Sequence, residues 1–130
     1  MITKTLFAAA IILSASTAAF AADPAMVGET AKGRTLIDAH GMTLYTFDKD
    51  SDGKSACNGP CAANWPPLAA AADAQSAASY TVVVRDDGSR QWAYKGHPLY
   101  TWTKDKKPGD ITGDGFLNGA WHVAQIRPMI

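Results

Sequence analysis

Short runs in which apolar and polar side chains alternate recur along this chain, and Gly, Pro, Asp and Ser separate them. This two-residue alternation is typical of β-strands that bury one face. We expect strands at 34–38, 42–47, 81–85, 91–94, 98–102 and 120–126. Between two of them, Asp87-Gly88 supplies the positive φ that a tight hairpin turn requires. The pattern therefore predicts a mainly β fold, a small antiparallel β domain.

The segment from 61 to 79 breaks the alternation. Trp65-Pro66-Pro67 is followed by an Ala-rich run at 69–78, whose composition favours helix but which has almost no apolar periodicity beyond Ala itself. We expect one short helix or loop insertion here, around 61–78. The Gly-rich run at 108–119 predicts a long irregular connection.

The N-terminus has the pattern of a cleaved signal peptide. Lys4 precedes an uninterrupted apolar run at 6–13, and Ala19-Phe20-Ala21 places small residues at the −3 and −1 positions. Ser14 ends the run too early for a membrane-spanning helix, which needs about 20 apolar residues. We expect a signal peptide at 1–21, a single domain at 22–130, a periplasmic or secreted location, and no stable membrane anchor after cleavage.

The chain also repeats itself. At an offset of 55 residues, both copies have the pattern Gly-x-x-Leu-Tyr-Thr-(Phe/Trp)-x-Lys-Asp, which begins at Gly41 and again at Gly96. Such internal similarity is the signature of a duplicated supersecondary unit. We therefore expect two related hairpin units, at about 33–68 and 91–126.

Within each repeat, Tyr45 and Phe47, like Tyr100 and Trp102, are two residues apart and share one face of a strand. The aspartates Asp50 and Asp105 follow the strand end, where a carboxylate can accept backbone N–H groups in a turn. A packed strand with a capped exit is the first interpretation. A ligand site built from the two Tyr/aromatic pairs is the alternative.

The motif Tyr-x-aromatic-x-x-Asp, at Tyr45 to Asp50 and Tyr100 to Asp105, resembles a bacterial family of small exported proteins, many of them lipoproteins, known as a secreted repeat of unknown function. The resemblance extends to 57–68 and to the ending at 119–123. It implies an exported protein and names no activity. Because the chain has no Cys before Cys57, the resemblance favours a soluble periplasmic member over a lipid-anchored one.

Cys57 and Cys61 are the two cysteines, and an even pair in an exported protein is normally bonded. We expect a structural disulfide that closes a loop of about five residues. A redox-active pair is the alternative, because Pro60 suits the first position of a helix and would place Cys61 in its first turn, where thiol pKa falls. The spacing Cys-x-x-x-Cys, and no βαβ pattern around it, argue against that alternative.

No metal or cofactor is predicted, and the alternatives are a calcium site and a copper site. Asp48, Asp50 and Asp52-Gly53 match the first half of a calcium loop, but the twelfth position, where the loop needs Glu, is Gly59. A transition metal such as copper would use three histidines and Met42, without ligand spacing between any two of the histidines. These histidines are His40, His97 and His122.

Charge and catalytic motifs narrow the function further. Twelve Lys and Arg residues balance twelve Asp and Glu residues, so the chain lacks the basic footprint of a nucleic-acid binder. No nucleophile elbow, zincin motif or phosphate loop is present. We expect a non-enzymatic binding or structural module for an unknown protein or small molecule, with a periplasmic redox or metal-binding protein as the alternative. The expected ligand surface is the exposed edges of Tyr45, Phe47, Trp65, Tyr100, Trp102 and Trp121.

Overall fold

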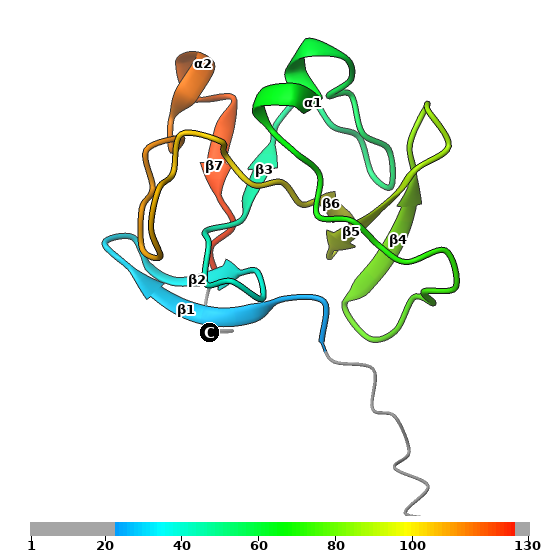
Figure 1. The fold of residues 1–130 in the computed structure, drawn as a ribbon, viewed down its shortest axis with the longest axis horizontal. Helices are drawn as coiled ribbons and strands as arrows, with labels where there is room; N and C mark the ends of the chain where they lie inside the picture. The colour runs from blue at the N-terminus through cyan, green and yellow to red at the C-terminus, as the bar shows by residue number, and fades with distance from the viewer. Residues whose placement is uncertain (1–22, 127–130) are drawn as a thin grey trace, which may run out of the picture.

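A computed structural model describes residues 23–126, so the predicted signal peptide lies outside the described residues. Within 23–126, no helix has the length and apolar character needed to cross a bilayer. The strands form three small antiparallel sheets, which confirms the predicted mainly β fold (Figure 1).

The first hairpin joins β1 (Met26–Thr30) to β2 (Gly33–Ile37), with Met26 opposite Ile37 and Thr30 opposite Gly33. The chain then turns back through an Ile37–Thr43 bridge into β3 (Tyr45–Phe47). The predicted strands at 34–38 and 42–47 are therefore found, the second in shortened form. The sequence pattern missed β1, whose residues are mostly exposed and do not alternate between apolar and polar.

The second hairpin joins β4 (Tyr80–Val84) to β5 (Arg90–Tyr94), and the predicted turn at 86–89 connects them. Strand β6 (His97–Pro98) continues this sheet but is shorter than predicted. Pro98 has no N–H to donate to the ladder, which contributes to the interruption. The last strand is β7 (Trp121–Val123), and it pairs with β3 from the other half of the chain.

Two short helical segments complete the fold. Helix α1 (Pro60–Asn64) begins at a proline and ends before Trp65-Pro66-Pro67, because the residue before a proline disfavours helical backbone. The Ala-rich run at 69–78 is a loop, so helix there is the wrong alternative. Its backbone makes bridges to the second sheet instead, Ala69 with Gln91 and Ala77 with Tyr80. Segment α2 (Phe116–Gly119) is one irregular turn within the predicted irregular connection.

The two halves meet at equivalent residues. Tyr45 and Tyr100 exchange both backbone hydrogen bonds, at 2.8 and 3.0 Å, so the two copies of the motif lie side by side and run in opposite directions. Such mutual pairing of equivalent residues is what a two-fold relation between the repeats produces.

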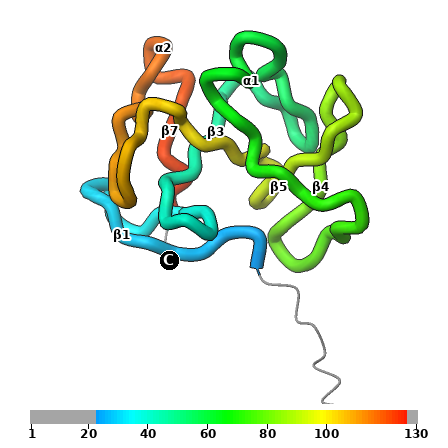
Figure 2. Tube along the Cα trace, viewed as in Figure 1, coloured from blue at the N-terminus to red at the C-terminus, as the bar shows by residue number. Residues whose placement is uncertain are grey.

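The end of each repeat packs on the hairpin unit of the other. The N–H of Ala124 donates to the carbonyl of Leu44 at 2.8 Å, and the N–H of Leu68 donates to the carbonyl of Leu99 at 2.9 Å. As a result, the red C-terminal strand lies with the blue and cyan first hairpin in Figure 2. We call the repeats exchanged, because the end of each repeat packs on the hairpin unit of the other and the two are not simply arranged one after the other.

Two apolar clusters stabilise this arrangement, one on each face of the motif strands. The aromatic cluster contains Tyr45, Phe47, Cys57, Trp65, Tyr100, Trp102, Trp121 and Val123. The aliphatic cluster contains Ala25, Leu36, Leu44, Leu99 and Ala124, with Leu68, Tyr80, Tyr94 and Ile126 packed against it. The alternation predicted for the motif thus places its Tyr and Phe or Trp in one cluster and its Leu in the other.

Candidate functional site

The motif tyrosine of each repeat donates its hydroxyl to the motif aspartate of the other repeat. Tyr45 donates to Oδ2 of Asp105 at 2.6 Å, and Tyr100 donates to Oδ2 of Asp50 at 2.7 Å. Both tyrosines are fully buried. The sequence pattern placed each aspartate in a local turn and did not indicate this reciprocal contact, which requires knowledge of how the repeats pair.

The second oxygen of each aspartate holds the loop that follows it. Asp50 Oδ1 accepts the N–H of Ala56 at 2.7 Å, and Asp105 Oδ1 accepts the N–H of Thr112 at 3.0 Å and its hydroxyl at 2.6 Å. The expected role of these carboxylates as acceptors of backbone N–H groups is therefore found, with donors six and seven residues downstream. Each motif aspartate joins its own loop to the opposite repeat.

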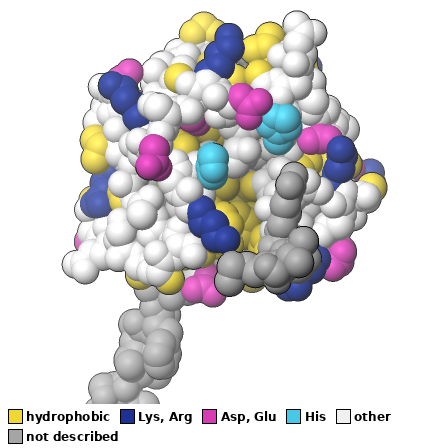
Figure 3. Space-filling model, turned by 180° about the vertical axis from the view of Figure 1, so that it is seen from behind, with side chains coloured by type: hydrophobic (Ala, Val, Ile, Leu, Met, Phe, Trp, Pro, Cys, Tyr) yellow, Lys and Arg dark blue, Asp and Glu magenta, His cyan; other side chains and the backbone are white. Residues whose placement is uncertain are grey.

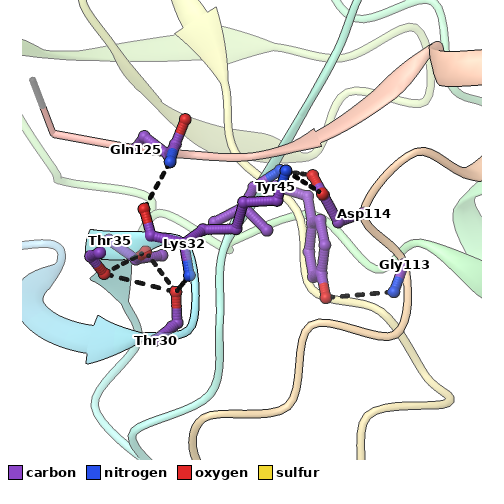
Figure 4. A network of polar contacts seen from close by, with 9 residues as sticks. Thr30, Lys32, Thr35, Tyr45, Gly113, Asp114 and Gln125 are labelled. Atoms are coloured by element: carbon purple, nitrogen blue, oxygen red, sulfur yellow. Dashed lines mark hydrogen bonds and ion pairs between the residues drawn. The ribbon is translucent and has the colours of Figure 1, made fainter.

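Burial sets the protonation of these groups. Burial and the hydrogen bond to Asp105 raise the pKa of Tyr45 well above its ordinary range, while the N–H of Gly113, 3.3 Å from the hydroxyl, opposes the rise (Figure 4). Burial likewise raises the pKa of Tyr100. Burial also raises the pKa of Asp50, although the Ala56 N–H and the Tyr100 hydroxyl act in the opposite direction. Both phenols are thus held in their neutral, donating form.

Four aromatic rings form a continuous stack beside the two tyrosines. Neighbouring ring centroids are 4.1, 3.8 and 4.0 Å apart along the order Phe47, Trp121, Trp65 and Trp102. Tyr45 meets Trp65 edge-on at 5.2 Å, and Tyr100 meets Trp121 edge-on at 5.0 Å. Offset-stacked and edge-to-face contacts of this kind stabilise a core by about 0.5–1.5 kcal/mol per pair beyond area burial.

These rings are core rather than ligand surface. Phe47 and Trp102 are each 7% exposed, and the other four rings are 2% exposed or less. The expectation that exposed edges of Tyr45, Phe47, Trp65, Tyr100, Trp102 and Trp121 bind a ligand is therefore wrong. The physical reason is that the rings of the two repeats cover one another, and the sequence alone did not show that the repeats interlock.

A buried arginine, Arg85, joins the segment 55–57 to β5. Arg85 is 5% exposed and donates to Ser55 Oγ at 2.9 Å, to Gln91 Oε1 at 2.7 Å and to the carbonyl of Cys57. Ser55 in turn contacts the Tyr100 hydroxyl at 2.6 Å. A buried guanidinium requires several acceptors, and this set supplies them. Arg85 was not singled out from the sequence, where it appears only as the end of a Val-rich strand.

Figure 4 shows a second link between the repeats. Lys32, in the β1–β2 turn, lies 3.1 Å from Asp114, and Asp114 also accepts the N–H of Val123 at 3.0 Å. Burial alone would raise the pKa of Asp114, but the Val123 N–H and the Lys32 ammonium hold it below its usual value. The first hairpin is thereby tied to the strand that the second repeat contributes.

Cys57 and Cys61 form the expected disulfide, with their Cα atoms 5.2 Å apart. Cys57 is fully buried in the aromatic cluster, and Cys61 packs against it from the first turn of α1. The bond therefore fastens the start of α1 to the core. Its position is that of a structural crosslink.

The acidic residues weighed for calcium have other partners. Asp50 is engaged by Ala56 and Tyr100, whereas Asp48 lies 2.8 Å from His122 at the surface. Asp52 is exposed. Across residues 23–126, no three His, Cys, Asp or Glu side chains come together as a metal site would require.

A hollow of about 1050 Å³ opens between the two hairpin units. We call it the inter-repeat hollow. Tyr80, Trp92 and Tyr94 line it from the second sheet, while Met26 and Val27 line it from β1 and are 51% and 48% exposed. Five of its lining residues belong to the aliphatic cluster or pack against it, namely Ala25, Leu36, Tyr80, Tyr94 and Ile126. The aliphatic cluster therefore provides the floor of the hollow.

The loop 71–79 forms the wall of the inter-repeat hollow. Arg90 holds this loop through the carbonyls of Ala72 and Ala74, the latter at 2.8 Å. Ser76 Oγ accepts the N–H of Val82 at 3.0 Å, and the N–H of Lys95 donates to the carbonyl of Ser79 at 2.8 Å. These contacts preform the wall. The sequence signal for this site was the pair of aromatics two residues apart on β5, outside the repeated motif.

A smaller hollow of about 390 Å³ lies on the other side of Tyr94 and Ile126, which line both. Lys95, His97 and His122 line it, and we call it the basic hollow. Figure 3 shows histidine and Lys or Arg side chains beside exposed hydrophobic atoms on this face. The structure thus brings His97 and His122 to one surface. It does not bring His40 with them, because His40 lies in the turn after β2, where its N–H donates to Asp38.

A family model described as a secreted repeat of unknown function matches the chain twice, over residues 26–69 and 81–125. Together the two matches span more than half of the sequence. The chain belongs to this secreted-repeat family. Neither a curated protein nor a solved structure matches the chain.

Membership of the secreted-repeat family confirms the resemblance drawn from the motif and identifies an exported protein. Each matched segment contains one hairpin, one Tyr-x-aromatic-x-x-Asp motif and one of the stacked tryptophans Trp65 and Trp121. The Tyr–Asp bonds and the ring stack therefore join one copy of the family repeat to the other. In this chain, the motif residues thus form the interface between the two copies.

The wall of the inter-repeat hollow has a different origin. The matched segments end at 69 and resume at 81, so the loop 71–79 lies between them. The floor draws on both matched segments, through Leu36 and Tyr94, whereas the wall is made by the connection that joins them.

Proposed function

We propose that this exported protein is a non-enzymatic periplasmic module that binds a small, largely apolar molecule in the inter-repeat hollow. The observation that supports the proposal is the hollow itself, with three partly buried aromatic side chains, Tyr80, Trp92 and Tyr94, around it. Ligand sites are typically concave, preformed and of about 300–1,000 Å³, with apolar and aromatic linings. The inter-repeat hollow is concave with an apolar and aromatic lining, and its volume of about 1050 Å³ lies just above that range.

The motif residues support a role without catalysis. The phenols of Tyr45 and Tyr100, whose pKa values burial raises, are bonded to the motif aspartates inside the core, where a substrate would have to displace those bonds. Perturbed groups mark catalytic sites when they face a cleft. Here the motif groups face the opposite repeat, and none of them lines the inter-repeat hollow.

A neutral polarity-sensitive dye tests the proposal. We expect N-phenyl-1-naphthylamine to gain fluorescence and bind saturably to the purified mature protein, because the hollow offers an apolar floor. Ala71→Trp, on the wall, places an indole ring at the hollow and should weaken dye binding and reduce the gain. Ala63→Trp is the matched control, because Ala63 is equally exposed but lies on α1 and outside the hollow.

The dye experiment can refute the proposal in two ways. Absence of saturable binding to the unmodified protein would contradict it. Equal dye binding by the Ala71→Trp and Ala63→Trp variants would also contradict it, since the dye would then bind elsewhere. Circular dichroism of both variants confirms that each is folded before the comparison is made.

A further inference from the structure

The charged side chains that line the inter-repeat hollow are acidic. Asp23 and Asp73 line it, and within the described residues none of its lining residues is Lys, Arg or His. The polar groups that remain are neutral, from Gln75, Ser76 and Ser79. A concave site lined by one sign of charge over apolar walls concentrates counter-ions of the opposite sign.

The aromatic lining favours the same kind of ligand. Tyr80 and Tyr94 lie 5.2 Å apart with their rings tilted by 50°, and Tyr80 meets Trp92 edge-on at 6.4 Å. Rings in this arrangement present π-faces in several directions, and such faces attract cations. Tyr94 already shows this behaviour, because the Lys95 ammonium lies 5.4 Å from its ring centroid.

The negative charge of Asp23 acts on one of these aromatic side chains, Tyr80. Burial raises the pKa of Tyr80, and the neighbouring Tyr94 and the charge of Asp23 raise it further. Asp23 therefore acts electrostatically on the hydroxyl of a residue that lines the hollow. A bound cation would lie in the same field and would be stabilised by it.

We propose that the inter-repeat hollow selects organic cations, namely molecules that carry an ammonium group on an apolar body. The apolar body rests on the aliphatic floor, and the ammonium group lies between the aromatic faces and the carboxylates of Asp23 and Asp73. This inference rests on the proposed binding function and adds the chemical class of the ligand. The basic hollow beyond Tyr94 and Ile126 is lined instead by Lys95, His97 and His122.

Three probes of similar size test the selection. They are benzyltrimethylammonium, its neutral isostere neopentylbenzene, and the anion phenylacetate. Binding is followed through the indole N–H signal of Trp92 in 15N-resolved NMR spectra, assigned with Trp92→Phe. We expect the cation to bind about five- to tenfold more tightly than the neutral isostere, which is the range of a partly desolvated cation–π contact. The anion should bind more weakly than both.

The outcomes separate the two proposals. If the neutral isostere binds as tightly as the cation, charge selection is overturned and the binding function stands. If no probe shifts the Trp92 signal and the dye does not bind either, both proposals are overturned.

Variants locate the selectivity. Asp23→Asn combined with Asp73→Asn should lower the affinity for the cation and leave the affinity for the neutral isostere unchanged, so the preference for the cation should fall. Glu29→Gln is the matched control, because Glu29 is an exposed acid on β1 that does not line the hollow. A cation preference that is undiminished in the double variant, or that falls equally in Glu29→Gln, would overturn the assignment of the two carboxylates.

Discussion

The bond between Tyr45 and Asp105 makes the exchange of the repeats measurable. In Tyr45→Phe, Oδ2 of Asp105 loses a donor at 2.6 Å and the N–H of Gly113 loses its acceptor, inside a core where neither group reaches water freely. A hydrogen bond to a charged group contributes about 1.5–3 kcal/mol. We expect Tyr45→Phe to lower the free energy of unfolding by about 2–3 kcal/mol, or the melting temperature by on the order of 10 °C.

The assay is a double-mutant cycle by urea unfolding with Tyr45→Phe and Asp105→Ala. The coupling energy between them should be about 1.5–3 kcal/mol, because each substitution removes the same bond. The control cycle pairs Tyr45→Phe with Asp50→Ala, the aspartate of its own repeat. Those two groups do not bond to each other in the structure, so their effects should add within about 0.5 kcal/mol. If Asp105→Ala does not fold, Asp105→Asn replaces it in the cycle.

The two cycles together test whether each motif tyrosine bonds to the aspartate of the other repeat. Coupling between Tyr45 and Asp50, with additivity between Tyr45 and Asp105, would refute the exchanged arrangement and place the motif contacts within each repeat. Additivity in both cycles would refute the role of the motif aspartate as the partner of a tyrosine.

Three further outcomes are expected. Burial raises the pKa of Tyr45 and Tyr100 in the folded protein, so the stability that these tyrosines contribute should be fully present below about pH 10, the ordinary pKa of unfolded tyrosine. Above that pH, the free energy of unfolding should fall by about 1.4 kcal/mol per pH unit for each tyrosine. Urea unfolding between pH 9 and 11.5 measures this slope, and an unchanged slope in Tyr45→Phe would contradict the prediction. Replacing Cys57 and Cys61 by Ser should cost about 2 kcal/mol and leave dye binding intact; dye binding lost at unchanged stability would indicate a functional thiol pair. Millimolar Ca²⁺ should not raise the melting temperature, because Ala56 and Tyr100 already occupy the Asp50 oxygens; a rise that Asp52→Ala removes would show a calcium site.

Local pattern was sufficient for the elements that depend on local physics. The turn at Asp87-Gly88, the hairpin around it and the helix start at Pro60 follow from backbone preferences, and the structure has all of them. The disulfide follows on another ground, because an even pair of cysteines in an exported protein is normally bonded. Strand β1 does not follow, since its exposed residues have no alternation to detect.

The contacts between the repeats could not be derived in the same way. The alternation correctly indicates that Tyr45 and Phe47 share a face, but it does not say what covers that face. The cover is Trp65 and Trp121, and the latter comes from the other end of the chain. An aromatic face that is covered and one that binds a ligand have the same sequence pattern, which is why the motif was open to both interpretations.

Exchange of the repeats also explains where a binding site can form. A single repeat would leave its tyrosine hydroxyl without the opposite aspartate and its tryptophan without the ring that stacks on it at 3.8 Å. Buried polar groups without partners and uncovered aromatic rings are both costly, so the two repeats should fold as one cooperative unit. That pairing buries the aromatic faces of both motifs. The hairpins β1–β2 and β4–β5 are then held apart by a core that neither repeat completes alone, and the inter-repeat hollow lies between them. The loop 71–79 closes one side of it without taking part in the core, so the site can change while the fold is retained.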